Sequence, residues 1–177
     1  MSPMDRDLLL KGKYTFKAHG QKLVVVKKPV ESTRHVVMKA LLWAIYLPRY
    51  PDLQVEVPIG YKYKPDLVQT GSGGPLFWAE AGRVSAQKLR RLLKRFPRTH
   101  FALAVWGASL AALEVRIRRT SREAKRLAPI DLIAFPRDAD VRFIDSRGTI
   151  RVDRDNLNWR PIPPPRPPHA RGQRLAG

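Results

Sequence analysis

Two carboxylates on either side of a glycine-rich turn are the residues of this sequence best placed for chemistry. Asp66 precedes and Glu80 follows residues 71–74, which read Gly-Ser-Gly-Gly. A turn near Gly73 pairs positions whose numbers add to 146, so Asp66 lies opposite or diagonal to Glu80, with Cβ atoms ~5–8 Å apart. Carboxylates at this separation can share Mg²⁺, whose remaining positions bind water and a phosphate oxygen.

The same two residues also have a structural interpretation. Asp66 follows Pro65 at the start of a strand, and Glu80 ends a strand before a turn. Paired carboxylates occur across hairpins without any metal, so the residues alone leave both interpretations open. Residues 71–74 are interpreted as a turn, because they lack the Lys-Ser/Thr pair and the following helix of a phosphate-binding loop.

The elements that position this pair follow from the hydrophobic pattern. Alternation around Gly20 predicts a hairpin over residues 13–28. Helical spacing predicts a helix that begins near Glu31 and ends at Pro48, and an amphipathic helix over 85–96 with leucines on one side and basic residues on the other. Strands are predicted at 54–57, 64–70, 75–80, 99–105 and 130–135.

The second half of the chain is less regular. Residues 109–113 and 121–127 are predicted as short helices, and 141–144 with 149–152 as a final hairpin. Tyr-Lys alternation over 61–64 favours a strand over a wall of a phosphate groove. The order ββ-αβββαβ with a mixed end predicts one α/β domain over residues 1–159. Residues 160–177 are rich in proline and arginine and are predicted to form a disordered, extended tail.

Charge indicates the class of partner. The chain has 177 residues, 34 Lys and Arg against 15 Asp and Glu, a net charge of +19 and a pI near 11.1. Such an excess attracts phosphates and releases their counterions, which favours nucleic acid; the alternative is a solvated helix surface. The candidate nucleic-acid contacts lie in two basic clusters and are Arg83, Arg90, Arg91, Lys94, Arg118 and Arg119.

Composition also excludes several classes. The chain has no cysteine, so disulfides, thiolate metal sites and cysteine nucleophiles are ruled out. No stretch approaches the ~20 apolar residues of a membrane span, and the first residues lack a signal-peptide core, so we expect a cytoplasmic protein that does not enter membranes. The histidines show no metal-ligand spacing. His35 follows Glu31 by four residues and would approach a metal there, although a histidine at such a position is more often a surface hydrogen-bond donor.

Three segments together resemble a known family. Glu31, Trp43 and Tyr46 keep their spacing on the first helix, Pro65-Asp66 follows, and residues 77–82 read Phe-Trp-Ala-Glu-Ala-Gly. This pattern resembles the YaeQ family, a branch of the PD-(D/E)XK, or restriction-endonuclease-like, phosphodiesterase superfamily, over about residues 13–159. The resemblance implies a restriction-endonuclease-like core, αβββαβ, with an N-terminal β-hairpin and a mixed C-terminal extension.

The resemblance also implies roles for single residues. Asp66 and Glu80 would be ligands of Mg²⁺ or Mn²⁺, and Glu31 would complete the metal site. The family's motif has lysine two positions after the acidic residue, where this sequence has Gly82. Lys88 on the following helix is the candidate to replace that lysine, with Arg83 second.

Three functions therefore follow from the sequence. The first is a metal-dependent nuclease acting on DNA or RNA, with a site made by Glu31, Asp66, Glu80 and Lys88. The second is a non-catalytic nucleic-acid-binding module on the same fold. The third is a partner-binding protein that acts through its proline-rich tail.

Overall fold

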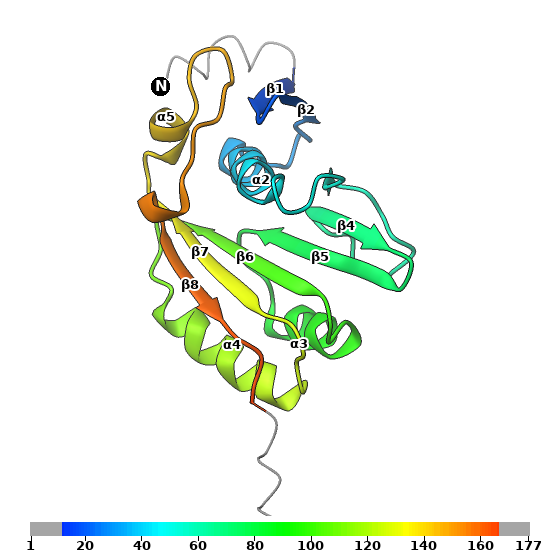
Figure 1. The fold of residues 1–177 in the computed structure, drawn as a ribbon. Coiled ribbons are helices and arrows are strands. Elements are labelled where there is room, and N and C mark those ends of the chain that lie inside the picture. Colours follow the sequence, from blue (N-terminus) through cyan, green and yellow to red (C-terminus); the bar gives the residue numbers. More distant parts are fainter. Residues whose placement is uncertain (1–11, 167–177) are drawn as a thin grey trace, which may run out of the picture.

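The computed structural model describes residues 12–166, which form a central sheet with helices on both faces (Figure 1). None of the helices in this part of the chain has the length and apolar character that crossing a bilayer requires. In chain order the elements are β1 (Lys13–Ala18), β2 (Gln21–Val26), α2 (Thr33–Tyr46), β3 (Gln54–Val55), β4 (Leu67–Gly71), β5 (Gly74–Ala81), α3 (Ala86–Arg95), β6 (His100–Trp106), α4 (Ala111–Glu123), β7 (Ile130–Phe135), α5 (Ala139–Phe143), the 3₁₀ helix η1 (Arg154–Asn156) and β8 (Asn158–Ile162).

The larger sheet has six strands in the order β3-β4-β5-β6-β7-β8. β5, β6 and β7 are parallel, and the pairs β3-β4, β4-β5 and β7-β8 are antiparallel. The two parallel connections contain α3 and α4 and step in the same direction across the sheet. Because such crossovers are right-handed, both helices must lie on one face, as Figure 1 shows.

Each face of the sheet has its own apolar core. On one face, Leu89 of α3 and Ile117 of α4 pack against the sheet. On the other face, α2 lies between the sheet and the hairpin β1-β2, where Tyr14 and Phe77 belong to the same cluster. Residues 36–44 of α2 are therefore all buried, and Lys39 is among them.

The first half of the predicted element order is confirmed: a hairpin, a helix, three strands, a helix and a strand. Ser32 caps α2 by accepting the His35 N–H at 3.2 Å, and Ser85 caps α3 by accepting the Lys88 N–H at 3.2 Å. The protein is thus a mixed α/β protein. The predicted strand over 61–64 is wrong, since residues 57–66 form an irregular loop.

The predicted pair of short helices, 109–113 and 121–127, is also wrong. The structure has one helix, α4, whose buried residues are Ile117, Thr120 and Ser121. Two of these are small polar residues, so the face that packs on the sheet carries a weak hydrophobic signal. The arginines between them are good helix formers and continue the helix.

The predicted final hairpin forms only in part. Residues 139–143 are the helix α5, and Ile144 makes a single bridge to Ile150 around a turn in which the Gly148 N–H donates to the Asp145 carbonyl at 2.9 Å. Gly148 has a φ of +75°, and a Cβ there would lie 2.2 Å from the Thr15 carbonyl oxygen. The turn therefore depends on glycine to pack against β1.

The predicted tail begins later than residue 160. Residues 158–162 are β8, which pairs with β7, and Ile162 is buried. Pro161 is tolerated because β8 is an edge strand, where a missing N–H costs no ladder bond. Residues 167–177 of the predicted tail lie outside the described residues.

Candidate functional site

The two carboxylates meet at one end of the hairpin β4-β5. Leu67 pairs with Ala79, so Asp66 and Glu80 are the next residues on each strand, and the Ala81 N–H donates to Asp66 Oδ2 at 2.8 Å. This confirms the predicted alignment of Asp66 with Glu80. The alignment depends on a β-bulge in the hairpin. Next to the turn, the sequence numbers of two paired residues add to 145. The register shift between Gln69 and Thr70 raises this sum to 146 for the pairs farther from the turn. Without the bulge, Asp66 would align with Ala79 instead of Glu80.

Glu80 is buried, with 4% of its surface exposed. Trp78 Nε1 donates to Oε1 at 2.8 Å, and Lys88 Nζ donates to Oε2 at 2.7 Å. Burial, helped by the charge of Asp66, raises the pKa of Glu80 even though the bond from Lys88 opposes it. The ammonium of Lys88, from the first turn of α3, therefore lies beside the buried Glu80 carboxylate.

The backbone at position 82 favours glycine. The chain leaves β5 at Gly82 with a φ of +92°, a conformation that L side chains rarely adopt. A lysine at this position would be strained, so a helical residue such as Lys88 is the accessible source of an ammonium group. Arg83, the second candidate, is exposed and forms no ion pair within residues 12–166.

Asp66 and Glu31 are joined by a histidine. His35 Nε2 lies 3.3 Å from Asp66 Oδ1 and 3.5 Å from Glu31 Oε1. Burial would raise the pKa of Asp66, but the bonds from His35 and from the Ala81 N–H outweigh it and lower this pKa. The hydrogen bond to Asp66 in turn raises the pKa of His35. His35 is thus part of the site.

Two further residues of the site were not found by sequence reasoning. Lys39 is fully buried, and its ammonium binds Glu31 Oε1 and, at 3.3 Å, Glu56 Oε1. Glu56 also lies 3.3 Å from Lys28 and has a φ of +57°. For Lys39, the sequence offered one signal of burial, which is a lysine within an otherwise apolar helical stretch. For Glu56 it offered no signal, because the residues that Glu56 contacts are distant in sequence.

These side chains border an open cleft of about 520 Å³ at the N-terminal end of α2. Glu31, His35 and Asp66 line it, whereas Glu80 and Lys88 lie beside it and do not line it. The structure thus brings together the predicted set but divides it between the cleft and a buried ion pair. The full lining is Lys28, Val30, Glu31, Ser32, His35, Glu56, Lys64 and Asp66.

The predicted metal ligands do not form a ready metal site in this arrangement. Within residues 12–166 no group of three or more His, Asp or Glu side chains is disposed to hold a metal ion. Both Glu80 oxygens accept hydrogen bonds, and each Asp66 oxygen faces an N–H group. The carboxylates are balanced by Lys39, His35 and Lys88 instead. A ligand role would require these contacts to open.

The predicted nucleic-acid contacts are all exposed, and all except Arg83 lie on α3 and α4, which contact each other on one face of the sheet (Figure 1). On α4, Arg118 donates to Glu114 at 2.8 and 2.9 Å, and Arg119 lies 3.9 Å from Glu123. On α3, Arg91 donates to the Tyr63 hydroxyl at 3.2 Å. We call the exposed basic residues of α3 and α4 the basic face; they are Arg90, Arg91, Lys94, Arg95, Arg118, Arg119 and Arg122.

Arg126, which follows α4 in the chain, is not on the surface. It is 1% exposed, and burial lowers the pKa of its guanidinium to about 10. The guanidinium donates to the carbonyls of Leu93 and Phe96 at the end of α3, and also to those of Thr99 and Ala128. Its role is structural.

The loop over residues 57–66 connects the basic face to the carboxylates. The ammonium groups of Lys62 and Lys88 each lie 5.6 Å from the centre of the Tyr63 ring. Tyr61 packs edge-on against the buried Trp78, whose indole N–H binds Glu80. Cationic and aromatic groups are therefore continuous from α3 to the candidate site.

Comparison with known proteins shows the class of fold. No protein-family model matches the chain, and no curated protein matches its sequence. Among solved structures, the fold is similar to that of the YaeQ protein from Pseudomonas syringae, with a TM-score of 0.55 and 20% sequence identity over 75% of this chain and 76% of that one.

A second similar structure is the YaeQ protein from Xanthomonas axonopodis pv. citri, with a TM-score of 0.48 and 14% identity over 73% of this chain and 74% of that one. Because the first match shares only 20% sequence identity with this chain, the similarity establishes a YaeQ-like fold and nothing about activity. The YaeQ resemblance seen in the sequence is thus supported by the architecture.

Proposed function

We propose that this protein binds nucleic acid through the basic face of α3 and α4. The observation that carries the proposal is the placement of both helices on one face of the sheet, which brings two basic clusters that are separate in the sequence into one layer. Glu114 and Glu123 are the acidic residues on these helices. A net charge of +19 adds a long-range attraction for phosphates.

The expected binding is electrostatic and independent of base sequence. Arginine presents planar, weakly hydrated donors that suit phosphate oxygens, and the exposed residues of both helices point away from the sheet. Contacts by about six cations would give a slope of about −5 in log affinity against log salt. Tyr63, partly exposed beside Arg91 and Lys88, adds an aromatic ring that can stack on an unpaired base.

The test measures binding of labelled duplex DNA, single-stranded DNA and RNA over a range of salt concentrations. The variant Arg90→Gln/Arg91→Gln/Lys94→Gln should bind at least tenfold more weakly with a slope smaller by about 3. The matched control, Arg142→Gln/Arg147→Gln/Arg151→Gln, removes equal charge from exposed positions outside the basic face and should bind nearly as well as the parent. Equal losses in both variants would mean that binding follows net charge and not this face.

A second candidate function is phosphodiester cleavage at the carboxylate site. The observation that favours it is that Asp66, Glu80 and Lys88, which a phosphodiesterase of the resembled superfamily needs together, converge at one end of β5. The Lys88 ammonium is placed to stabilise the negative charge that develops on a phosphate during attack. The expected Mg²⁺ or Mn²⁺ would need the Lys88–Glu80 and His35–Asp66 contacts to open.

Its test incubates the full-length protein with supercoiled plasmid, single-stranded DNA and RNA in Mg²⁺, Mn²⁺ or chelator. Cutting should require metal and disappear in Asp66→Asn and Glu80→Gln preparations that still bind nucleic acid. Asp138→Asn, at an exposed carboxylate outside the carboxylate site, is the control and should cut normally. No cutting by the parent, or cutting that survives both site variants, would reject the cleavage function and leave nucleic-acid binding as the proposal.

A further inference from the structure

Two exposed lysines, Lys28 and Lys64, line the mouth of the cleft beside the carboxylates. Lys28 follows β2, and Lys64 belongs to the loop before β4, so they come from separate parts of the chain. Their ammonium nitrogens lie 3.3 and 4.0 Å from the same atom, Oε1 of Glu56. The two ammonium groups are therefore held close enough together that one phosphate group arriving from solvent can contact both.

The exposed side of this mouth is cationic. The buried Lys39 ammonium also lies 3.3 Å from Glu56 Oε1, so one carboxylate faces three ammonium groups. The side chains of Lys28 and Lys64 are 53% and 42% exposed, whereas that of Glu56 is 21% exposed. A ligand from solvent therefore meets the two ammonium groups before it meets the carboxylate, which favours a ligand with negative charge.

The start of α2 adds a donor to the same mouth. Ser32 lines the cleft, and because its Oγ accepts the His35 N–H, its own hydroxyl hydrogen can donate to a ligand. The N-terminal end of α2, which carries partial positive charge, lies at the cleft as well. Val30, almost fully exposed, is the apolar residue of the lining. The mouth thus combines charged and neutral donors with a small apolar surface.

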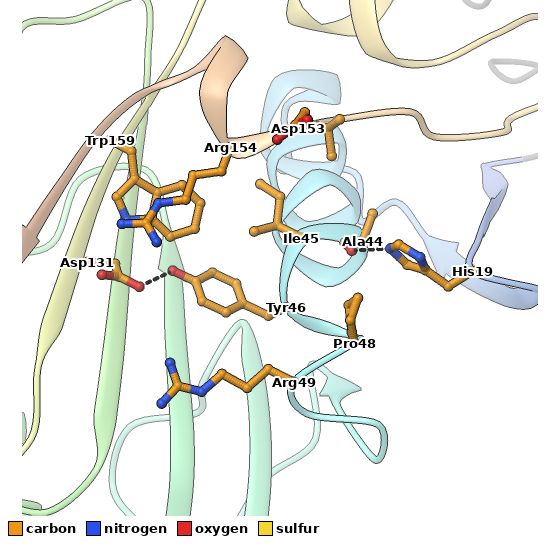
Figure 2. A pocket seen from close by; sticks show the side chains of 11 residues that line it. His19, Ala44, Ile45, Tyr46, Pro48, Arg49, Asp131, Asp153, Arg154 and Trp159 are labelled. Carbon is orange, nitrogen blue, oxygen red and sulfur yellow. Dashed lines mark hydrogen bonds between the residues drawn. The ribbon is translucent and has the colours of Figure 1, made fainter.

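A pocket of about 400 Å³ at the C-terminal end of α2 offers no comparable contact (Figure 2). Its buried carboxylate, Asp131, accepts the Tyr46 hydroxyl at 2.7 Å and lies 2.9 Å from His100 Nε2. In Figure 2 the indole nitrogen of Trp159 points toward the same carboxylate. The polar groups of that pocket are directed at one another and stabilise the fold, whereas the lysines at the mouth of the cleft remain open to a ligand.

The loop over residues 57–66 leads from the mouth of the cleft to the opposite face of the sheet. Lys64 lies at the mouth, and the preceding residue, Tyr63, accepts a hydrogen bond from Arg91 of α3 at 3.2 Å. Tyr61 packs edge-on against Phe96 at the end of α3, with ring centres 5.1 Å apart. Figure 1 shows α2 and α3 on opposite faces of the sheet. A ligand that contacts both the basic face and the cleft must therefore turn at this loop.

Such a turn selects the form of nucleic acid. Duplex DNA is stiff, with a persistence length of about 50 nm, so it does not fold around the edge of one small domain. A single strand bends within a few nucleotides, and its unpaired bases can stack on an aromatic side chain. Tyr63 is partly exposed and lies on the path between the two surfaces.

We infer that the ligand of the basic face is a single-stranded nucleic acid that passes over the loop, with one of its phosphates between Lys28 and Lys64. This inference rests on the proposed nucleic-acid binding, to which it adds the form of the ligand and a second point of contact. The recognised chemistry is a phosphodiester backbone with unpaired bases, which DNA and RNA strands share. The contact places a phosphate at the entrance to the cleft whether or not the carboxylates cleave it.

The experiment uses the absence of cysteine from the chain, which allows a single thiol to report on each surface. Val30→Cys lies in the cleft, Val115→Cys lies on α4 among the arginines of the basic face, and Val141→Cys lies on α5, outside both. All three positions are exposed. The rate at which a neutral maleimide modifies each thiol is measured in the full-length protein with and without single-stranded DNA, single-stranded RNA or duplex DNA of equal length.

The single strands should slow modification about fivefold or more at Val30→Cys and Val115→Cys. The duplex should slow it only at Val115→Cys, and the rate at Val141→Cys should not change. Adding Lys28→Gln/Lys64→Gln should remove the protection of Val30→Cys and reduce the salt slope of single-strand binding by about 1.5, while duplex binding stays the same.

The matched control is Lys17→Gln/Lys22→Gln, which removes an exposed pair of lysines that face each other across the hairpin β1-β2. It should leave the protection of Val30→Cys intact. Equal losses from the two lysine pairs, or equal protection of Val30→Cys by the duplex, would overturn the inference.

The three thiols also separate this inference from the proposed function. Protection of Val115→Cys without protection of Val30→Cys would overturn the inference and leave binding by the basic face standing. Protection of Val30→Cys alone would support the contact at the cleft and reject the basic face as the binding surface. Failure of every nucleic acid to bind would reject both.

Discussion

Lys39→Met is the sharpest test of the ion-pair network behind the cleft. Methionine has a similar length but no charge, and it leaves Glu31 and Glu56 without the fully buried ammonium that now binds both. Removing one partner of a buried ion pair costs about 3–5 kcal/mol. Here His35 at 3.5 Å from Glu31 and Lys28 at 3.3 Å from Glu56 retain part of the compensation. The expected loss is therefore about 2–3 kcal/mol.

The assay is urea unfolding followed by tryptophan fluorescence. With an m value of about 2 kcal/mol per M for a domain of this size, the midpoint should fall by about 1–1.5 M. Glu31→Gln in the Lys39→Met background should restore part of the loss, because it removes a carboxylate that has lost its partner. The pKa of Glu56 is lowered in the fold by Lys39 and Lys28 against the effect of burial.

That lowered pKa sets the pH dependence. A carboxyl whose folded pKa is depressed stabilises the fold above its unfolded pKa, and this contribution disappears as the pH falls through the folded value. Lys39→Met removes part of the contribution, so the difference between parent and variant should shrink on acidification below about pH 4.5. A variant whose unfolding free energy at pH 7 lies within 0.5 kcal/mol of the parent's would refute the reasoning that this buried pair is net stabilising.

Three further predictions concern single side chains. Arg126→Met should destabilise the fold by about 3 kcal/mol in the same unfolding assay, because it strips buried carbonyls at the end of α3 of their donor; a loss below 1 kcal/mol would contradict this role. Gly148→Ala should lower the melting temperature by several degrees, since the new Cβ would lie 2.2 Å from the Thr15 carbonyl, whereas Gly73→Ala, with open space around it, is the control. His35, whose pKa is raised by Asp66, should contribute stability that is full below about pH 6.5 and is lost as the pH rises through its folded pKa; His35→Gln should flatten this slope, and an unchanged slope would contradict the pairing.

Patterns within a few residues of each other predicted the helices whose ends and buried side are marked in their own sequence. Ser32 and Pro48 bound α2, Ser85 begins α3, and the leucines of α3 mark its buried side, so short-range spacing located these helices. The failures share a cause. Where α4 buries Thr120 and Ser121, no apolar period exists to detect, and at residues 158–162 strand pairing with β7 overrides a proline-rich composition.

The site divides in the same way. Asp66 and Glu80 were predictable as a pair because the positions of a hairpin can be matched by counting from its turn. They align across the hairpin, however, only because of the register shift between Gln69 and Thr70, which no residue in the turn specifies. Lys88 was predictable as a candidate on the next helix. The contact of its ammonium with Glu80 depends on how α3 packs against β5.

By itself, the sequence determined the α/β class, the basic character, the absence of cysteine chemistry and the candidate carboxylates, because each depends on composition or on neighbours within a few positions. The tertiary structure decided that Lys39 bridges Glu31 and Glu56, that Arg126 is buried, and that α3 and α4 share one basic face. It alone assembled the pocket at the end of α2 from residues as far apart as His19 and Trp159. Those outcomes depend on burial and on contacts between distant segments, which exist only once the chain has folded.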